Sequence, residues 1–535
     1  MSTITATVQD TTQPHTQSNE ISPASSGLSH WINVCKGYLD KLYPISKNNS
    51  NLIFNDNPSS ATHPHETVDD IDGYIKEELY KLSQNHDPSV EDLDHKFRDF
   101  GGHDRNPLTS LISLVKSSVF PPPLSELLQE RLNDAHVPVW DTMDEEIVIV
   151  GGYKGSILKE RSTGKKLWMS LKAGFNLADV DLTIGPNPED EIQAQKDVIA
   201  EDMMCEVGPV DISMKLKRKL MESGKCKVHT FGYDWRLSQH INSTRLHEFL
   251  SKLDCNQPGS HRKGAIVIAH SMGGLISHHA MQKAPELFKG LVYAGVPSET
   301  ANILGPFKYG DPVLFNNNII TPESSFFMRS GFVFLPEDGR CFVDANTGRE
   351  YNLNFFDPEV WTKYNLCPLV SQDRLDYEQR IKETPLSSSL PPLAHAKEER
   401  TYQYRTSFAD CKKYLTRTLQ ETQQFHSELK HDPTKNYPPL VMLYGDTVPT
   451  GRGSFVSSHQ AIIDGEWEDL DNTKPIFGAG DGTVYHKFLM PERKEGFKVA
   501  KKVRSERNHM GLLTDLDGVS RCLEGIIQWY EENER

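Results

Sequence analysis

The residues best suited to chemistry begin with a serine on a tight, glycine-flanked turn. Ser271 follows the apolar run 265–269 and precedes Met272 and Gly273, which predicts a buried strand, a sharp turn and a helix. Such a turn holds a serine hydroxyl clear of the sheet, where it can act as a nucleophile. The same pattern is also typical of a serine that caps a helix, so the rest of the chain has to decide between the two interpretations.

A serine nucleophile needs a histidine base and an acid that orients the histidine. His509 follows the last predicted strand, which is where hydrolases of the α/β type carry the base. The preferred acid is Asp481, in the glycine-rich turn 478–482, and the alternative is Asp446, directly after the predicted strand 440–444. We therefore expect a Ser-His-Asp triad with one of these two aspartates as its acid.

Two backbone N–H groups are expected to stabilise the oxyanion that forms when a serine attacks an ester. One belongs to Met272, immediately after the nucleophile, and we assign the other to Tyr153, in the glycine-rich turn that follows the first predicted strand. The glycines of this turn could instead cradle a phosphate, but the residue spacing of a phosphate-binding loop is absent.

Short apolar strands alternate with amphipathic helices from about residue 147 onward. The expected strands are 147–150, 227–231, 265–269, 290–295, 440–444 and 497–503. This pattern predicts an α/β fold of the α/β-hydrolase type, with a mostly parallel central sheet and helices on both faces. A cap or lid insertion and a disordered N-terminal tail complete the expected architecture.

The composition divides the chain into a tail, a lead-in and a catalytic domain. Residues 1–68 are expected to be a largely disordered tail with a short amphipathic helix at 30–43, and residues 69–145 a helical or irregular lead-in. The catalytic domain is expected at 146–532, with a cap segment at about 156–205 and a lid insertion at about 298–437.

Charge and cysteine content exclude several classes of function. The formal net charge is −16, which argues against a nucleic acid partner. No apolar stretch approaches the roughly 20 residues that a membrane-spanning helix needs, and the first thirty residues contain no signal-type apolar block. The eight cysteines lack the spacing of a disulfide framework or a zinc site. We expect an intracellular protein, cytoplasmic or peripheral on a cytosolic membrane face, with no transmembrane helix, no metal and no cofactor.

Separated motifs resemble the lecithin:cholesterol acyltransferase-like family, which includes lysosomal phospholipase A and phospholipid:diacylglycerol acyltransferases. The motifs are the Gly151-Gly152 turn, the run Tyr233-Asp234-Trp235-Arg236-Leu237, the run 269–273, and the run 480–484 with His509 beyond it. The resemblance covers about residues 146–529 and implies Ser271 as nucleophile, Asp481 as acid and His509 as base. The segment 443–450 resembles a further family segment, and this alignment leaves Asp446 outside the triad.

The resemblance also implies a lipid ester substrate, with phospholipid as the first candidate, and a cap that touches a membrane. Trp168 in this cap either contacts lipid or packs internally. Asp234 and Arg236 are expected to form a structural ion pair under the site, although Arg236 could instead meet a lipid phosphate. Gly152 stands where relatives usually carry proline, which leaves the substrate and lid geometry open.

The expected reaction is acyl transfer through an acyl-enzyme on Ser271, with water or a lipid alcohol as the acceptor. The aromatic cluster within 326–334 either lines an acyl groove or forms the core of the insertion, and the second is the commoner arrangement. The alternative function is a catalytically silent scaffold or interaction protein. The presence of Ser271, Asp481 and His509 together argues against this alternative.

Overall fold

The computed structural model describes residues 139–168, 181–207, 210–259, 264–313, 316–383, 404–465, 467 and 475–533. The expected tail at 1–68, with its helix at 30–43, lies outside these residues, and so does the lead-in as far as residue 138. The boundaries expected for these two regions therefore stay predictions.

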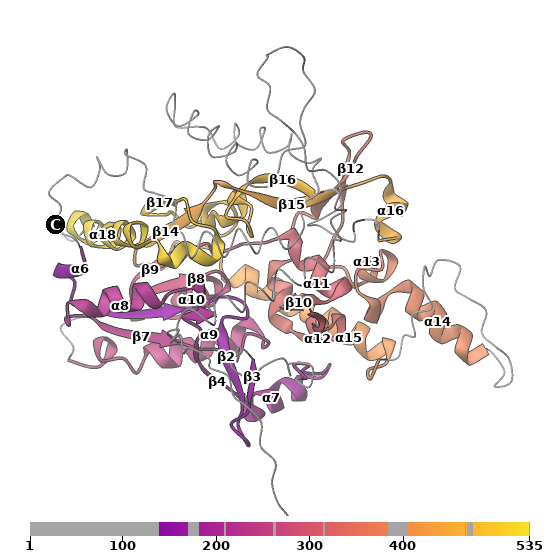
Figure 1. Cartoon of the computed structure of the whole chain (residues 1–535), viewed down its shortest axis with the longest axis horizontal. Coiled ribbons are helices and arrows are strands. Elements are labelled where there is room, and N and C mark those ends of the chain that lie inside the picture. Colours follow the sequence, from indigo (N-terminus) through magenta and orange to yellow (C-terminus); the bar gives the residue numbers. More distant parts are fainter. Residues whose placement is uncertain are drawn as a thin grey trace, which may run out of the picture. The chain divides into compact units, whose positions relative to one another are not determined.

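A six-stranded parallel sheet forms the centre of the described fold, in the order β17-β14-β9-β8-β1-β7 (Figure 1). Its strands are β1 (Glu146–Val150), β7 (Lys227–Phe231), β8 (Ala265–His270), β9 (Phe288–Ala294), β14 (Leu440–Gly445) and β17 (Lys501–Ser505). Every neighbouring pair is parallel. The predicted α/β class is confirmed, and each expected strand lies in this sheet. The last strand begins four residues later than expected, at Lys501.

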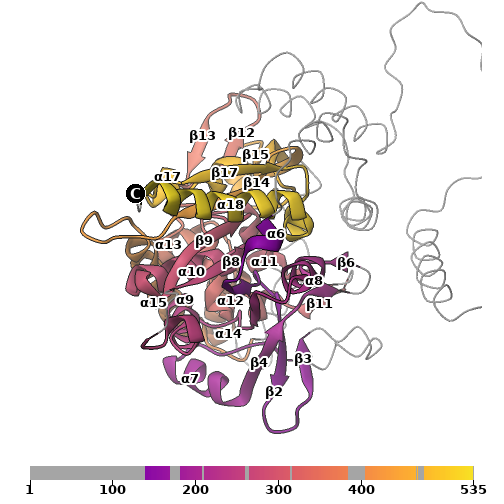
Figure 2. The same cartoon turned by 90° about the vertical axis from the view of Figure 1, so that its left-hand side faces the viewer.

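Strand residues alternate between two hydrophobic cores, one on each face of the sheet. In β8, Ile266 and Ile268 belong to one core, whereas Val267 and Ala269 belong to the other. One face packs against α6 (Val139–Thr142), α8 (Met214–Glu222) and α18 (Leu516–Asn533), and the other against α9 (Gln239–Leu250) and α10 (Met272–Lys283). Figure 2 shows α18 running alongside β14 and β17. Because both faces are covered, β8 is buried along its whole length, which explains its unbroken apolar sequence.

Smaller sheets are inserted between the strands of the central sheet. The first has the order β3-β2-β4 and is built from β2 (Ser156–Glu160), β3 (Lys166–Trp168) and β4 (Val198–Met203), with α7 (Pro188–Asp197) between β3 and β4. Two hairpins pair β5 (Glu206–Val207) with β6 (Val210–Asp211) and β10 (Asp311–Val313) with β11 (Asn316–Ile320). A four-stranded sheet has the order β13-β12-β15-β16 and is built from β12 (Arg340–Asp344), β13 (Glu350–Asn352), β15 (Val448–Val456) and β16 (Pro475–Gly480).

The four-stranded sheet joins two separate excursions from the central sheet. Strand β12 belongs to the long segment between β9 and β14, whereas β15 and β16 belong to the segment between β14 and β17. Residue Phe342 of β12 is in register with Ser454 of β15. The segment in which the lid was expected is therefore paired, through β12, with the segment between β14 and β17.

The segment between β9 and β14 is mainly helical, and its helices lie together at one side of the sheet in Figure 1. Its α-helices are α11 (Leu304–Tyr309), α12 (Pro322–Phe327), α13 (Pro358–Lys363), α14 (Gln372–Glu383) and α15 (Phe408–Glu428), with 3-10 helices η4 (Ala301–Ile303), η5 (Arg329–Phe334) and η6 (Pro368–Val370). The other short helices are η2 (Asp254–Asn256), η3 (Pro285–Leu287), α16 (His459–Ile463), η7 (His486–Leu489), α17 (Pro491–Lys494) and η8 (His509–Thr514).

Aromatic side chains form the core of this helical segment. Phe326, Phe327 and Phe332 are fully buried and pack around the ring of Tyr414 from α15. Trp361 from α13 extends the same cluster. Of the two arrangements expected for residues 326–334, the structure shows the packed core.

Within the described parts of the chain, no helix combines the length and the apolar character needed to cross a bilayer. The seven cysteines in these parts are free thiols, and six of them are buried. The cysteines described therefore add to the packing of the core rather than cross-linking it.

Candidate active site

Ser271 occupies a strained turn between β8 and α10. Its φ of 53° and ψ of −131° lie outside the regions that non-glycine residues usually adopt. The strand ends at His270, and the helix begins at Met272. The Ser271 side chain makes no capping hydrogen bond to α10. The geometry is therefore that of a nucleophile elbow rather than that of a helix N-cap.

Glycines allow the elbow to pack closely on its surroundings. A Cβ atom on Gly273 would lie 2.3 Å from the carbonyl oxygen of Gly151, and a Cβ on Gly274 would lie 2.1 Å from the side chain of Val296. Real Cβ atoms do not approach neighbours this closely. The small residues after the serine are thus required by the contact between α10, the 151–155 turn and the chain after β9.

The side chain of His509 connects Ser271 with Asp481. Its Nε2 atom lies 3.0 Å from Oγ of Ser271, and its Nδ1 atom lies 2.7 Å from Oδ2 of Asp481. The backbone N–H of His509 also donates to the carbonyl oxygen of Asp481, at 2.7 Å. An Nδ1–H that donates to the carboxylate leaves Nε2 free to accept the serine proton, which is the tautomer that a general base requires.

The carboxylate of Asp481 is fully buried, and both of its oxygens accept hydrogen bonds. Oδ1 accepts from the backbone N–H groups of Thr483 and Val484, at 3.0 and 2.7 Å. Oδ2 is thereby left to His509. The alternative acid, Asp446, is engaged elsewhere, because its Oδ1 accepts from Nε of Arg504 at 2.6 Å. Of the two candidate acids, the structure brings Asp481 to the histidine.

A second histidine, His270, supports His509 from behind. Its Nε2–H donates to the backbone carbonyl of His509, at 2.8 Å. Burial, together with the neighbouring His509, lowers the pKa of His270 to about 3, so the ring is neutral near pH 7. The sequence reasoning missed this residue, although it directly precedes the serine.

Gly295 lies against the contact between acid and base. Its φ is 62°, and a Cβ at this position would lie 3.1 Å from Nδ1 of His509 and 3.2 Å from Oδ2 of Asp481. The same atom would lie 2.6 Å from a methyl group of Leu512. Only glycine fits here without displacing these groups. The glycine at the end of a buried strand was the available sequence signal for this role.

The glycine-rich turn after β1 lies beside the serine. A Cβ on Gly152 would lie 2.7 Å from Cβ of Ser271 and 3.3 Å from its Oγ. The backbone of this turn therefore reaches the position where an oxyanion would form. The N–H of Met272 is available at the same place, because the first N–H groups of a helix have no partner within it. The roles expected for Tyr153 and Met272 as backbone donors stay predictions, and this arrangement lies beside the serine as those roles require.

Three aromatic residues hold the carbonyl groups of this turn. The hydroxyl of Tyr233 donates to the carbonyl oxygens of Gly151 and Gly152, at 2.9 and 3.0 Å. Nε1 of Trp168 donates to the carbonyl of Lys154 at 2.8 Å, and Nε1 of Trp235 to that of Ser156 at 3.3 Å. These donors fix the carbonyl side of each peptide and with it the direction of the N–H groups.

Trp168 has a supporting role in this arrangement. Only 4% of its surface is exposed, and its ring packs edge-on against Trp235 at a centroid distance of 5.1 Å. Of the two expectations for this residue, internal packing agrees with the structure, and contact with lipid does not. A tryptophan in a cap sequence does not by itself distinguish the two roles.

Asp234 and Arg236 form a buried, bidentate ion pair. Nε and one terminal nitrogen of Arg236 donate to the two carboxylate oxygens of Asp234, at 2.9 and 2.7 Å. Both residues are buried, at 0% and 3% exposure. This is the structural pair that was expected, and burial keeps the guanidinium away from a lipid phosphate in solvent.

The side chain of Tyr153 points into the aromatic core of the insertion. Its ring packs edge-on against Trp235 and Phe334, each at 5.9 Å between centroids, and its hydroxyl donates to the sulfur of Met328 at 3.4 Å. Burial raises the pKa of Tyr153 well above its usual value, so the phenol stays neutral. The side chain anchors the turn, and the backbone N–H is the part that remains for chemistry.

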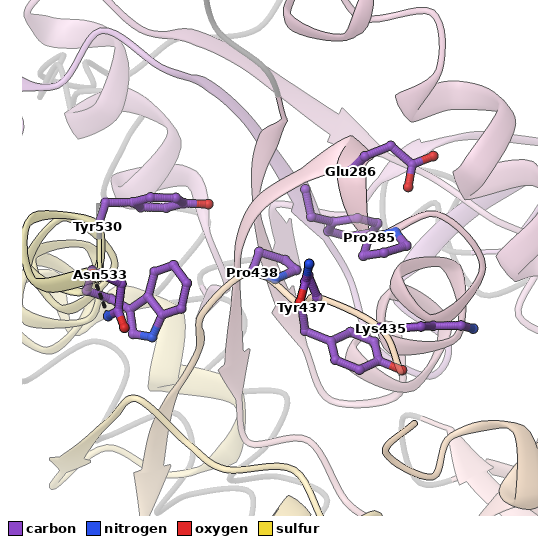
Figure 3. Close-up of a pocket in the computed structure, with 10 residues that line it drawn as sticks. Pro285, Glu286, Lys435, Tyr437, Pro438, Tyr530 and Asn533 are labelled. Atoms are coloured by element: carbon purple, nitrogen blue, oxygen red, sulfur yellow. Dashed lines mark hydrogen bonds between the residues drawn. The ribbon is translucent and has the colours of Figure 1, made fainter. Parts of the chain in front are cut away.

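A cavity of about 590 Å³ lies elsewhere on the molecule (Figure 3). It is lined by residues such as Phe288, Tyr437 and Trp529. Phe288 begins β9, whereas Ala294, the last residue of that strand, accepts the backbone hydrogen bond of Ser271 at 2.9 Å. The cavity is therefore at the opposite end of the strands from the serine.

Comparisons with known proteins identify the family to which the chain belongs. The profile of the family described as lecithin:cholesterol acyltransferase matches residues 215–488, a range that contains Ser271 and Asp481 and ends before His509. The uncharacterized protein YJR098C of Saccharomyces cerevisiae is 40% identical over 425 residues, which cover 74% of this chain and 64% of that protein. The chain thus spans just under two thirds of the length of this relative.

Two solved structures show a more distant similarity. One is the Tle4-Tli4 complex, with 14% identity, a TM-score of 0.42, and coverage of 72% of this chain and 98% of the matched one. The other is tomato methylketone synthase I complexed with 2-tridecanone, with 12% identity, a TM-score of 0.22, and coverage of 72% and 99%.

Proposed function

Because this chain belongs to the lecithin:cholesterol acyltransferase family, we propose that it hydrolyses or transfers the acyl group of a lipid ester through an acyl-enzyme on Ser271. The observation that carries the proposal is the hydrogen-bonded chain from Ser271 through His509 to Asp481. Phospholipid is the first candidate for the acyl donor.

In the first half of the reaction, Oγ of Ser271 attacks the ester carbonyl while Nε2 of His509 takes the hydroxyl proton. Asp481 stabilises the imidazolium that forms. The N–H groups of Met272 and Tyr153 stabilise the oxyanion of the tetrahedral intermediate. Collapse of the intermediate expels the alcohol of the donor, which takes the proton from His509, and leaves the acyl group on the serine.

In the second half, His509 removes a proton from water or from a lipid alcohol, which then attacks the acyl-enzyme. Water gives a free fatty acid, and a lipid alcohol gives a new ester. The choice depends on how well the closed site excludes water. Ser271 and His509 are only 7% and 5% exposed, so the proposal includes an opening movement that admits the lipid.

We also propose an intracellular location with peripheral contact to a membrane surface. The free cysteines described above support a reducing compartment. A lipid ester substrate supports contact with a membrane, since such a substrate resides there.

A fluorophosphonate probe tests the serine mechanism directly. We expect labelling of the purified full chain near neutral pH, loss of labelling in Ser271→Ala, and normal labelling in Ser427→Ala, a control on the exposed end of α15. Labelling that persists in Ser271→Ala would contradict the assignment of the nucleophile. A protein that is folded but never labelled would favour the catalytically silent scaffold.

Product analysis then separates hydrolysis from transfer. The protein is incubated with phospholipid vesicles that contain or lack a diglyceride or a sterol. Free fatty acid in both mixtures indicates a hydrolase. A new ester that forms only with the added alcohol indicates a transferase. The variant Ser271→Ala should give neither product.

A further inference from the structure

Three potential metal ligands from three helices meet at a point distinct from the serine site. His240 lies on α9, His279 on α10 and Glu428 on α15. One ligand atom from each lies within 4.8 Å of the others. His279 is eight residues after Ser271, which is about 12 Å along a helix, so this cluster is separate from the triad.

The distances within the cluster are close to those of a metal site. Oε2 of Glu428 lies 2.6 Å from Nε2 of His279 and 3.1 Å from Nε2 of His240. Tetrahedral zinc with bonds of about 2.0–2.1 Å separates its ligand atoms by about 3.3 Å. A small rotation of the Glu428 side chain would make this room. Two histidines and one glutamate also form a donor set that zinc uses in proteins.

Neighbouring side chains orient two of the three ligands. The hydroxyl of Ser243 lies 2.6 Å from Nδ1 of His279, and Nε2 of Gln424 donates to Oε1 of Glu428 at 2.8 Å. An Nδ1–H that donates to Ser243 leaves the lone pair of Nε2 for a metal ion. Such supporting partners are typical of metal-binding histidines and carboxylates.

One side of the cluster is open to solvent. His279 is buried, whereas the side chains of His240 and Glu428 are 29% and 33% exposed. An ion can therefore enter, and a water molecule can complete the coordination. Without a metal, Glu428 would simply accept hydrogen bonds from the two imidazoles and link the helices in that way.

We propose that His240, His279 and Glu428 bind one zinc ion with water as the fourth ligand. The ion would join α15 of the insertion to α10, the helix that begins next to Ser271. The sequence predicted no metal site, because the two histidines are 39 positions apart and Glu428 lies 149 positions after His279.

Zinc binding to the full chain tests the proposal. The purified protein is treated with a chelator and dialysed, and zinc chloride is then added while bound metal and thermal unfolding are measured. We expect one zinc ion per chain and a higher Tm with zinc. His240→Gln and Glu428→Gln should weaken binding by at least about 100-fold, since even supporting partners of a metal site contribute 10- to 100-fold.

Matched controls come from the same helices. His247→Gln on α9 and Glu421→Gln on α15 should bind zinc like the wild type. The variant His240→Gln retains a hydrogen-bond donor. If the cluster is held only by hydrogen bonds, His240→Gln should therefore lower Tm by a small amount that is the same with and without zinc. Ser243→Ala should weaken binding by about 10- to 100-fold.

Cobalt substitution adds a readout of ligand type. Cobalt bound at this cluster should show visible absorption without the charge-transfer band of a cysteine thiolate. A wild-type protein that binds no zinc, or zinc binding that is equal in His240→Gln, would overturn the proposal. Cobalt absorption dominated by thiolate would overturn it as well, because it would place the metal at cysteines.

Discussion

The ring of His270 donates a hydrogen bond to the backbone carbonyl of His509, which lies 239 positions further along the chain. The two rings lie 4.7 Å apart between centroids. The elbow therefore supplies the serine and also a support for the histidine that faces it. This support is neutral at neutral pH, because the pKa of His270 is lowered to about 3 by burial.

His270→Phe removes this donor and retains a ring of similar size. We expect kcat for a model ester to fall about tenfold, which corresponds to an increase of about 1.4 kcal/mol in the activation free energy. A positioning role also predicts little change in KM and an unaltered apparent pKa of the base in the pH profile. His247→Phe, on an outer helix, is the control. Wild-type kcat in His270→Phe would contradict the role.

Asp481→Asn and Asp446→Asn distinguish the two candidate acids. We expect Asp481→Asn to lower kcat about 10⁴-fold, because the amide favours the wrong tautomer of His509. Asp446→Asn should keep kcat near the wild-type value and lower the free energy of unfolding by about 1 to 2 kcal/mol, because it weakens the pair with Arg504. Steady-state kinetics and urea unfolding measure the two effects, and the reverse pattern would exchange the roles.

Gly295→Ala places a methyl group against His509, Asp481 and Leu512. We expect kcat to fall on the order of 100-fold, because small displacements of catalytic groups are costly. The positive φ and the crowding should also lower the free energy of unfolding by about 1 to 3 kcal/mol. Gly305→Ala is the control, since a Cβ there meets no atom within 4 Å. Normal activity in Gly295→Ala would contradict the claim that only glycine fits beside His509 and Asp481.

Tyr233→Phe leaves the carbonyls of Gly151 and Gly152 without their shared donor. We expect a loss of about 1 to 3 kcal/mol in the free energy of unfolding, because a buried acceptor becomes unsatisfied. The turn should also lose its alignment, and kcat should fall about 10- to 100-fold with little change in KM. Tyr414→Phe, which loses one bond to the carbonyl of Phe326, should change stability without changing kcat. Equal kcat in the two variants would contradict this role for Tyr233.

The unfolding free energy should fall between about pH 7 and pH 5. Burial lowers the pKa of His270 and His278 to about 3 and that of His279 to about 4, so these rings stay neutral in the folded chain. The unfolded chain takes up these protons below the ordinary pKa of 6.5. The free energy of unfolding therefore falls by about 1 kcal/mol per histidine for each pH unit of acidification.

Carboxyl groups with a raised pKa act in the opposite direction, and they include Glu323, Glu421 and Asp517 as well as Glu495. Burial raises the pKa of Glu495 to about 7, so its carboxyl group contributes more stability as the pH falls towards 4.5. Among these carboxyl groups Glu495 has the largest shift, and the three histidines outweigh it. Urea unfolding across this pH range measures the slope, and His278→Phe should make it shallower by about 1 kcal/mol per pH unit. Stability that rises on acidification would contradict the expectation.

The inner strands of the central sheet could be predicted from sequence because they are buried on both faces. A strand such as β8 then reads as an unbroken apolar run, which is hard to mistake. The four-stranded sheet escaped prediction, since β12 and β15 are more than 100 residues apart and pair only after the chain has folded. Such long-range pairing leaves no local pattern.

In the candidate site, too, some features follow from a local sequence pattern and others do not. The positions of Ser271, Asp481 and His509 followed from chain order and glycine-rich turns, and their catalytic roles stay predictions until activity is measured. The hydrogen bonds from His270 and Tyr233 could not be read from sequence, because each depends on a backbone carbonyl of a distant segment. Carbonyl groups carry no signature of their own in an amino-acid sequence.

The backbone hydrogen bond from His509 to the carbonyl of Asp481 has a consequence for how the site tolerates mutation. It holds the two loops together through atoms that no side-chain replacement removes. The imidazole of an Asp481→Asn enzyme should therefore keep its place while losing its chemical partner. Position and reactivity at this site therefore depend on different atoms, so a variant that has lost its activity can keep the arrangement of the site.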